Sequence, residues 1–370
     1  MKNLYISLLF LALPLASVAQ KSAIGTVKTK DGGTYTGQIS GGKPSGKGKT
    51  TYANGASYEG EYEKGKRQGD GIYTDADGEK YSGQWFQDER HGKGTYVFKS
   101  RNKYVGFWYK GEQTGEGKML YHNGDTYEGE WLKGKRNGRG KYVYKDGSYY
   151  NGTWKDDEKN GEGTFVWKDG SSFSGNWINS LKEGEGIYIY PNGDEYKGGW
   201  KADLQHGKGI YKYKNGDLYE GDFIAGQRTG SGVMRYKNGD TYSGYFFEGQ
   251  RAGQGTMSWR NGDIYTGGWE KDLMSGLGKL TKRNKDIIEG TFRRGKMEGE
   301  IIIRYANGNK FRGTYKDGRR NGHAVEESAN GTRFEGAYMN DQRHGKFIER
   351  DKTGAITARG YYENGKRITN

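Results

Sequence analysis

Residues 127–149 read YEGEWLKGKRNGRGKYVYKDGSY, a stretch of glycine, aromatic and charged residues with few aliphatic side chains. The same pattern returns 23 residues earlier and 23 residues later. With the aromatic residue of Y-x-G as position 1, fourteen anchors follow at this spacing without an insertion, from Tyr35 to Phe334, and Ile288 is the one that is not aromatic. One repeat therefore fills residues 35–356, with a partial repeat at 20–34 and another, offset by one residue, at 357–370.

The fixed glycines and turn residues of the repeat predict β-hairpins. Positions 3 and 12 are glycine in every repeat, and position 14 is glycine in the first eleven. Asn-Gly or Asp-Gly stands at positions 20–21 in eleven repeats, which is a strong hairpin signal because both residues tolerate positive φ. Gly, Asp or Ser at position 8 marks a second turn. Each repeat is therefore predicted to form two strands and two turns.

Strand periodicity predicts where the core lies. Side chains at positions 1, 3 and 5 share one face, and positions 12, 14, 16 and 18 share the same face of the second strand. We expect rings interleaved with glycines on that face, completed only by neighbouring repeats. The predicted fold is all-β, an elongated single-layer antiparallel sheet of tandem hairpins. Its predicted core includes Tyr58, Trp85, Tyr127, Trp131, Trp154, Trp177, Trp200 and Trp269.

Composition excludes a disordered chain in spite of a net charge of +14. The 370 residues include 67 Gly but also 31 Tyr, 13 Phe and 9 Trp, so aromatic side chains supply the burial that aliphatic ones do not. There is no cysteine, which excludes disulfides, thiolate metal sites and a cysteine nucleophile. The excess of basic residues favours anionic partners without identifying one.

The first residues, MKNLYISLLFLALPLASVAQ, differ from all that follow. Lys2 precedes an apolar run from Leu4 to Ala16, and Ser17 and Ala19 fit a cleavage site before Gln20. Residues 1–19 are therefore predicted to be a secretory signal peptide, with a retained membrane anchor as the alternative. We expect an exported protein, located in the periplasm, at the envelope or outside the cell, with no transmembrane segment after cleavage.

The quoted stretch closely resembles the MORN repeat (membrane occupation and recognition nexus), whose pattern is Y-E-G-E-W-x-x-G-x-x-x-G-x-G followed by an N-G or D-G turn. The resemblance covers most of the chain at constant phase. It implies an elongated antiparallel sheet, no intrinsic enzymatic activity, and a role in scaffolding, self-association or attachment to membranes and other proteins.

No arrangement of residues predicts catalysis, a metal or a cofactor. GGKPSGKGKT at 41–50 lacks the first glycine of a phosphate-binding loop, because Lys43 stands in its place. His91, His206 and His344 recur at position 11 of repeats too far apart to share a metal. Asp156, Asp157 and Glu158 are expected in a solvated turn. The sequence therefore predicts a protein that is not an enzyme.

Basic residues recur at position 10 in nine repeats and are predicted to follow one long edge of the sheet. The edge is a candidate site for an anionic lipid or an acidic polysaccharide, and solubility is the competing interpretation. The candidates are Arg67, Arg90, Arg136, Lys159, Lys182, Arg228, Arg251, Arg320 and Arg343.

The sequence favours a non-enzymatic scaffold of the cell envelope or exterior that binds a protein partner, pairs with a second copy or attaches to a membrane. The alternative is a module that binds glycans or anionic lipids through the basic edge and exposed rings. Nucleic acid is not expected as a partner of an exported chain. The last three repeats depart from the pattern, either as a cap or as a binding surface of their own.

Overall fold

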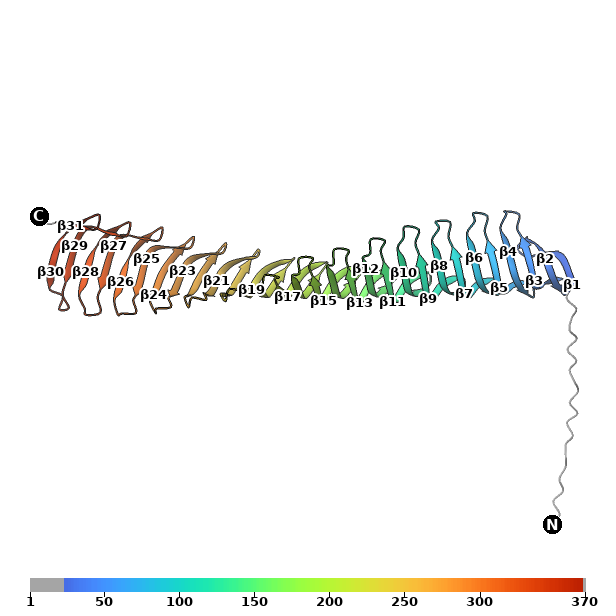
Figure 1. Ribbon diagram of the computed structural model, residues 1–370, viewed down its shortest axis with the longest axis horizontal. Coiled ribbons are helices and arrows are strands. Elements are labelled where there is room, and N and C mark those ends of the chain that lie inside the picture. Colours follow the sequence, from blue (N-terminus) through green and yellow to red (C-terminus); the bar gives the residue numbers. More distant parts are fainter. Residues whose placement is uncertain (1–22, 369–370) are drawn as a thin grey trace, which may run out of the picture. The chain divides into compact units, whose positions relative to one another are not determined.

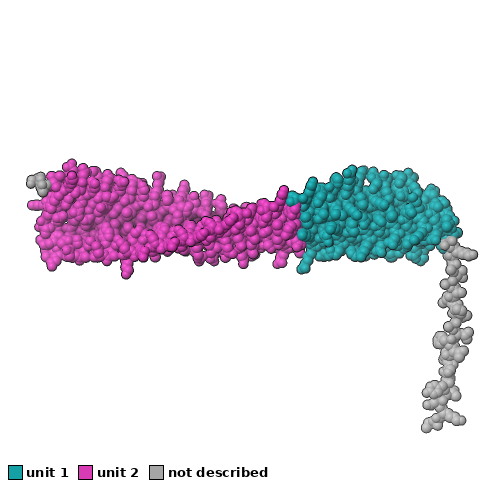
Figure 2. Space-filling view, in the orientation of Figure 1, with its two compact units in different colours: residues 1–146, 154–157 teal, residues 147–153, 158–370 magenta. Residues whose placement is uncertain are grey.

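The computed structural model describes residues 23–368, and every regular element in that range is a β-strand. The chain divides into two compact units, residues 1–146 with 154–157 and residues 147–153 with 158–370 (Figure 2). The predicted signal peptide lies outside the described residues and stays a prediction, as do the predicted domain boundaries. None of the described residues forms a helix of the length and apolarity that crossing a bilayer requires.

The described part of unit 1, from residue 23, contains eleven complete strands: β1 (Ala23–Lys28), β2 (Thr34–Ser40), β3 (Lys43–Thr51), β4 (Ser57–Glu63), β5 (Lys66–Thr74), β6 (Lys80–Phe86), β7 (Glu89–Val97), β8 (Lys103–Tyr109), β9 (Glu112–Leu120), β10 (Thr126–Leu132) and β11 (Lys135–Val143). The next strand, β12 (Tyr149–Lys155), is divided between the units.

Unit 2 contains the remaining strands of the described range: β13 (Glu158–Val166), β14 (Ser172–Ile178), β15 (Leu181–Ile189), β16 (Glu195–Lys201), β17 (Leu204–Lys212), β18 (Leu218–Ile224), β19 (Gln227–Arg235), β20 (Thr241–Phe247), β21 (Gln250–Ser258), β22 (Ile264–Glu270), β23 (Leu273–Thr281), β24 (Ile287–Arg293), β25 (Lys296–Arg304), β26 (Lys310–Lys316), β27 (Arg319–Glu327), β28 (Arg333–Met339), β29 (Gln342–Arg350), β30 (Ile356–Glu363) and β31 (Lys366–Ile368).

Within each unit, successive strands pair antiparallel with their neighbours in the chain (Figure 1). The register is the same from repeat to repeat. Position 3 of the first strand lies opposite position 14 of the second, as Gly60 lies opposite Gly71 and Gly129 opposite Gly140. The predicted all-β fold of tandem hairpins in a single antiparallel layer is confirmed.

Both turns of the repeat use backbone conformations that its sequence favours. In the Asn-Gly turn, Gly124 has a φ of 98° and donates its N–H to the carbonyl of Tyr121 at 3.0 Å. At positions 7 and 8, Asp156 and Asp157 both have positive φ, at 49° and 73°. Two consecutive residues with positive φ match the right-handed twist of a hairpin, which explains why Gly, Asp and Asn gather there.

One face of the sheet, here called the ring face, carries the side chains of positions 1, 5, 10, 14 and 16. All eight aromatic residues predicted as core are buried there, and Tyr58 and Tyr127 have no exposed surface. Rings of positions 1 and 5 alternate in edge-to-face contacts with centroids 4.9 to 5.5 Å apart, from Tyr35 to Trp154 in unit 1 and from Tyr150 to Phe292 in unit 2. Edge-to-face packing places the positive edge of one ring against the negative face of the next, which is favourable. Within each unit the core is therefore a continuous row of aromatic contacts.

The polar atoms of these rings are also satisfied by the sheet. Tyr127 donates its hydroxyl to the carbonyl of Glu130 at 3.0 Å, and Trp131 donates Nε1–H to the carbonyl of Gly117, in the preceding repeat, at 3.1 Å. Gly140 is required beneath the ring, because an added Cβ there would lie 2.2 Å from the hydroxyl of Tyr127. Each repeat therefore closes the core of its predecessor.

Position 12 departs from the strict alternation expected from the sequence. The strand pairing shifts register after position 3, as between Gly129 and Trp131. Gly138, at position 12, has a φ of 80°, and an added Cβ there would meet the side chain of Glu130 on the opposite face. The prediction that position 12 shares the ring face is wrong because a bulge follows the Gly–Gly pair.

The last repeats replace rings and glycines by aliphatic residues. Ile301 stands at position 14 opposite Gly290, and it is fully buried with Ile303, Phe311 and Ala324 in one apolar cluster. Glu326 takes a ring position, where it accepts a hydrogen bond from Tyr338 and pairs with Arg343 at 2.6 Å. The departures from the repeat pattern are thus accommodated inside the fold.

Candidate functional site

The nine basic residues of position 10 lie against aromatic rings. Each cation is within 5.7 Å of the ring centroid at position 5 of the following repeat. Arg67 over Trp85 at 4.4 Å and Lys159 over Trp177 at 4.3 Å are examples. The side chain of Arg136 is only 18% exposed. These cations are therefore part of the packing of the ring face.

The same residues bind the turn of the following repeat. Arg136 donates its backbone N–H and Nε–H to the carboxylate of Asp157, both at 3.0 Å, and a guanidinium N–H to the Asp157 carbonyl at 2.9 Å. Where position 8 is glycine, the guanidinium binds the backbone instead, as Arg90 does with the carbonyl of Gly111 at 2.8 Å. A role of position 10 in binding an anionic partner stays a prediction, and the geometry gives these residues a structural role.

Burial changes the chemistry of two of these cations. Desolvation lowers the pKa of Lys159, and it also lowers the pKa of Lys182, which has Asp203 as an opposing charge nearby. A lysine that is partly desolvated and stacked on a ring is a poor contact for a mobile phosphate or carboxylate group. The exposed cations of the same edge include lysines of position 7, such as Lys64, Lys110 and Lys133.

The opposite edge of the sheet is held by the acidic residue of position 22. Asp125 accepts hydrogen bonds from the hydroxyl of Tyr142 at 2.7 Å and from the N–H of Lys145 at 2.8 Å, both in the next repeat. Asp194 binds Tyr211 and Lys214 in the same way. These carboxylates therefore join neighbouring repeats along this edge.

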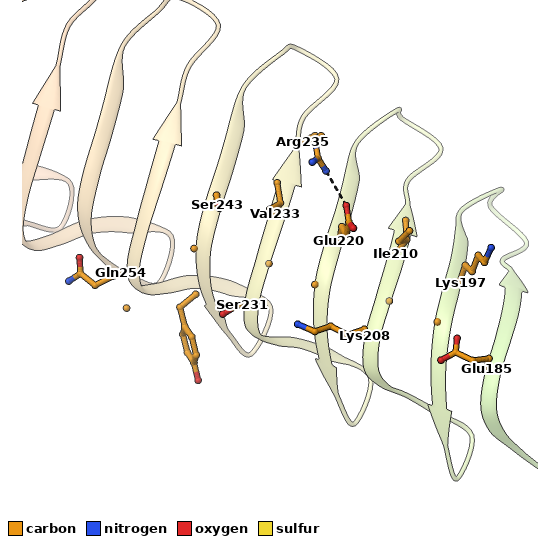
Figure 3. Close-up of a pocket in the computed structure, with 17 residues that line it drawn as sticks. Glu185, Lys197, Lys208, Ile210, Glu220, Ser231, Val233, Arg235, Ser243 and Gln254 are labelled. Atoms are coloured by element: carbon orange, nitrogen blue, oxygen red, sulfur yellow. Dashed lines mark hydrogen bonds and ion pairs between the residues drawn. The ribbon is translucent and has the colours of Figure 1, made fainter.

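The other face of the sheet, here called the back face, carries the side chains of positions 2, 4, 6, 9, 13, 15 and 17 and is open. A groove of about 1150 Å³ follows this face across β15–β21 in unit 2. Figure 3 shows two rows of side chains, with Ile210, Glu220 and Val233 in one row and Lys208 and Ser231 in the other. Between the rows lie paired glycines of positions 3 and 14, which include Gly198, Gly209, Gly221 and Gly232.

The floor of the groove is therefore backbone, because positions 3 and 14 face the rings on the other side of the sheet: a Cβ added to Gly221 or to Gly232 would lie 2.5 Å from the hydroxyl of Tyr219. Its two rows carry charges of both signs, and some are paired, as Arg235 is with Glu220 at 3.4 Å (Figure 3). A second groove of about 760 Å³ in unit 1 has the same construction, with Gly60 and Gly71 between Glu59 and Asp70. The groove belongs to the repeat and recurs with it.

Apolar side chains at position 6 follow the back face beside the position-8 turn. Seven of the fourteen repeats carry one, and these side chains are between 41% and 54% exposed: Phe86, Tyr109, Leu132, Ile178, Ile224, Phe247 and Met339. His91 lies between Phe86 and Tyr109, with centroids 5.5 and 5.6 Å away. The sequence contains this series, but the core pattern of positions 1, 5, 14 and 16 does not reveal it because position 6 faces away from the core.

The histidines and the phosphate-loop-like segment of the described residues have structural surroundings. Among residues 23–368, no three His, Asp or Glu side chains come close enough to hold a metal ion. His91 packs on rings, and His344 lies beside Tyr361 with centroids 6.2 Å apart. Lys43–Thr51, which covers most of the phosphate-loop-like segment, is strand β3 rather than a loop.

The geometry defines a class of protein, a repeat protein whose tandem β-hairpins share an aromatic core within each unit. Fourteen consecutive segments within residues 35–346, most of them 23 residues long, match the MORN repeat family. The chain therefore belongs to the MORN-repeat family. No curated protein matches it.

Several solved structures share limited similarity with the chain. The TCP10 domain of Danio rerio CPAP, in complex with a peptide of Danio rerio STIL, is 13% identical over 60% of this chain and 98% of that chain, with a TM-score of 0.30. The SAS-4 (dCPAP) TCP domain of Drosophila melanogaster, in complex with a proline-rich motif of Ana2 (dSTIL), is 16% identical over 42% of this chain and 85% of that chain, with a TM-score of 0.28. Virginiamycin B lyase from Staphylococcus aureus is 14% identical over 77% and 92%, with a TM-score of 0.13. No functional conclusion follows from these values.

Proposed function

We propose that this MORN-repeat protein is a non-enzymatic scaffold that holds a segment of a partner protein against its back face. The observation that carries this proposal is the groove of about 1150 Å³ between two rows of side chains. The floor of bare glycine backbone lets another chain approach the sheet closely. The mixed charges and apolar side chains of the rows supply the contacts that orient such a chain.

The two faces of the sheet differ in their availability. On the ring face, residues such as Trp131 and Tyr127 are buried by their neighbours, and their polar atoms are already bonded. A partner there would have to displace rings that hold the repeats together. On the back face, Phe86, Tyr109 and Phe247 are about half exposed without a covering element. Exposed apolar side chains that recur along one face favour a protein contact.

Repetition makes such a surface multivalent. Each repeat contributes two strands, so the same rows recur about every 10 Å along the direction of strand stacking. A partner segment that lies across several repeats gains from many weak contacts that act together. The residues in the rows differ along the groove: Ile210 and Val233 are apolar, whereas Ser231 is polar. Each stretch of the groove therefore favours different side chains of the partner segment.

The match of fourteen repeats to the MORN repeat family supports a role that is not enzymatic. The location of this role, at the cell envelope or exterior, rests on the signal-peptide pattern of residues 1–19. An exported protein without cysteine must depend on non-covalent packing, and the aromatic core and the links between repeats supply it.

Capture of partners from an envelope extract tests the proposal, with two matched variants. Val233→Glu adds a negative charge in the groove, whereas Ala225→Glu adds the same charge at a position-7 turn where Glu248 shows that glutamate is tolerated at a φ of 48°. The proposal expects specific proteins retained by the wild type and by Ala225→Glu, and lost with Val233→Glu. Equal retention by all three would contradict it.

An anionic lipid surface or acidic polysaccharide is the second candidate, favoured by exposed lysines beside exposed apolar side chains. Lys110 and Lys133 are exposed at position 7, next to Tyr109 and Leu132 at position 6. Aromatic and aliphatic side chains flanked by lysine suit a charged interface. Co-sedimentation with anionic vesicles that is lost at high salt would support it, and no pelleting with any vesicle would exclude the lipid.

A further inference from the structure

Hairpin turns with Asn-Gly at positions 20 and 21 recur along the described residues. Their asparagines, all of them exposed, are Asn54, Asn123, Asn192, Asn215, Asn238, Asn261, Asn307 and Asn330. Asparagine followed by glycine is the sequence most prone to spontaneous deamidation, because glycine places no side chain beside its own backbone nitrogen. The repeat therefore presents the same reactive pair eight times in one molecule.

The reaction needs no enzyme. The backbone nitrogen of the glycine loses its proton and bonds to Cγ of the asparagine, the Cγ–Nδ2 bond breaks, and ammonia leaves with that proton. Water then opens the succinimide ring at either carbonyl, which gives aspartate or isoaspartate. One water molecule is consumed and one ammonia is released, with no change in oxidation state. The rate therefore depends on how the glycine N–H and the asparagine amide are held.

The backbone of the eight turns is the same. The φ of each glycine lies between 88° and 98°, and its N–H donates to the carbonyl of position 18 at 2.9 to 3.0 Å, as Gly55 does with Tyr52. Each asparagine Oδ1 accepts the N–H of position 22 at 2.9 to 3.1 Å. Because these features are matched, differences in rate should come from the side-chain amide.

In five turns the amide is held by an aspartate at position 22. Asn123 donates Nδ2–H to Asp125 at 2.9 Å, and the same bond in the other four turns measures 2.8 to 3.2 Å. The next repeat fixes this carboxylate, since Asp125 also accepts from Tyr142 and from the N–H of Lys145. Ring closure has to break the charge-assisted bond and create negative charge beside a carboxylate.

In three turns the amide nitrogen has no partner among residues 23–368: Asn54, Asn307 and Asn330. Position 22 of the first turn is Ala56, which has no polar side-chain atom. Position 22 of the second is Asn309, whose Oδ1 accepts the N–H of Ala329 at 2.9 Å and whose remaining side-chain group can only donate. Thr332 of the third turn donates its hydroxyl to Oδ1 of Asn330 at 2.9 Å, which withdraws electrons from Cγ.

We propose that Asn54, Asn307 and Asn330 are the sites at which the folded protein deamidates, and that aspartate at position 22 protects the other five turns. Asn330 should react fastest, because two donors polarise its carbonyl. Each event adds a negative charge at a hairpin end. Isoaspartate also lengthens the main chain of the turn and moves the acceptor away from the N–H of position 22, so that hairpin end loosens.

Peptide mapping by mass spectrometry tests the assignment, because conversion of an amide to an acid changes the mass of each tryptic peptide. The purified protein is incubated in mildly alkaline buffer, folded or in concentrated urea. In the folded protein, Asn54 and Asn307 should convert about tenfold faster than Asn123, which corresponds to the loss of one hydrogen bond to a charged group. In urea the three rates should become similar. A ranking that persists in urea would overturn the proposal.

An added acceptor tests the protection directly. Ala56→Asp places a carboxylate beside Asn54, and Tyr73 stands in the next repeat where Tyr142 stands relative to Asp125. The variant should slow conversion of Asn54 about tenfold in the folded protein and leave its rate in urea unchanged. An unchanged rate at Asn54 in the folded variant would overturn the proposal.

The reverse exchange is Asp125→Asn, which reproduces the turn of Asn309. It should raise the rate at Asn123 to that at Asn307, with the unaltered turn of Asn192 as the internal control. Equal rates at Asn123 and Asn192 in this variant would overturn the proposal. So would folded protein in which Asn307 stays intact while it converts in urea. The turns do not line the groove, so either result leaves the proposed function unaffected.

Discussion

The guanidinium carbon of Arg67 lies 4.4 Å from the ring centroid of Trp85, which belongs to the next repeat, while its Nε–H faces the carboxylate of Asp88 at 3.4 Å. One side chain thus joins the turn and the core of two repeats. The same arrangement recurs at Arg136 and Arg251. Position 10 therefore stabilises the stacking of repeats, whatever else the protein binds.

Replacing Arg136 by alanine should lower the free energy of unfolding by about 1 to 2 kcal/mol, since a cation–π contact contributes about 0.5 to 2 kcal/mol and the carboxylate partner is half exposed. Arg136→Lys should keep part of the contact with Trp154 and lose the bidentate geometry. Urea unfolding of Arg136→Ala, Asp157→Asn and the double variant measures the coupling. Strictly additive losses would contradict a direct link between the two residues.

Replacing Trp131 by alanine should cost about 3 to 5 kcal/mol, because its ring is 5% exposed and contacts Tyr104 and Tyr127. The matched control is its neighbour Leu132, which is 51% exposed on the back face, and Leu132→Ala should change stability by less than about 0.5 kcal/mol. Chemical denaturation followed by circular dichroism gives both values. Similar losses for the two variants would contradict the assignment of faces.

Replacing Gly129 by alanine should destabilise the protein by about 1 to 3 kcal/mol or more, because the new Cβ would lie 2.3 Å from the Cα of Gly140 and the strands would have to separate. Glu128→Ala, on the neighbouring exposed residue, removes only a surface ion pair with Lys118 and should cost less than about 1 kcal/mol. The midpoints of urea unfolding of the two variants measure these losses. A Gly129→Ala protein as stable as the wild type would show that the Gly129–Gly140 pair tolerates a side chain.

Stability should fall in alkaline solution. Burial raises the pKa of Tyr265 to about 12, and it raises that of Tyr242 to about 12 as well, whereas an unfolded tyrosine titrates near pH 10. The folded state therefore holds protons that the unfolded state releases, so this contribution is fully present below about pH 10 and is lost as the pH rises towards about 12. The lowered pKa values of Lys159 and Lys182 make stability rise with pH instead. These two lysines are outnumbered by the buried tyrosines.

The measurement is urea unfolding across this pH range together with the ultraviolet absorbance of tyrosinate. We expect a falling midpoint and late titration of the buried rings. Tyrosine absorbance that titrates completely near pH 10 while the fold persists would contradict the burial of these hydroxyl groups.

Most of the fold follows from the sequence because the physical constraints repeat. Asn123-Gly124 and the glycines of positions 3 and 14 act through local geometry, so their spacing alone predicts hairpins and register. The bulge that turns Gly138 away from the ring face depends on pairing between strands, which alternation along one strand does not contain.

The site was harder to predict for the same reason. The sequence shows that Arg67 and Arg136 recur at one position, but only the structure shows them lying on rings of the next repeat. The groove depends on what lies between two rows, namely the bare backbone of pairs such as Gly221 and Gly232.

Site-specific photo-crosslinking tests the central claim, that the back face holds the partner. A photoreactive residue at Ser243, which lines the groove, is compared with the same residue at Glu248, in the exposed turn of the same repeat. We predict a covalent adduct with the captured protein from position 243 and none from position 248. Adducts from position 248 alone would place the partner at the turn edge and contradict the account.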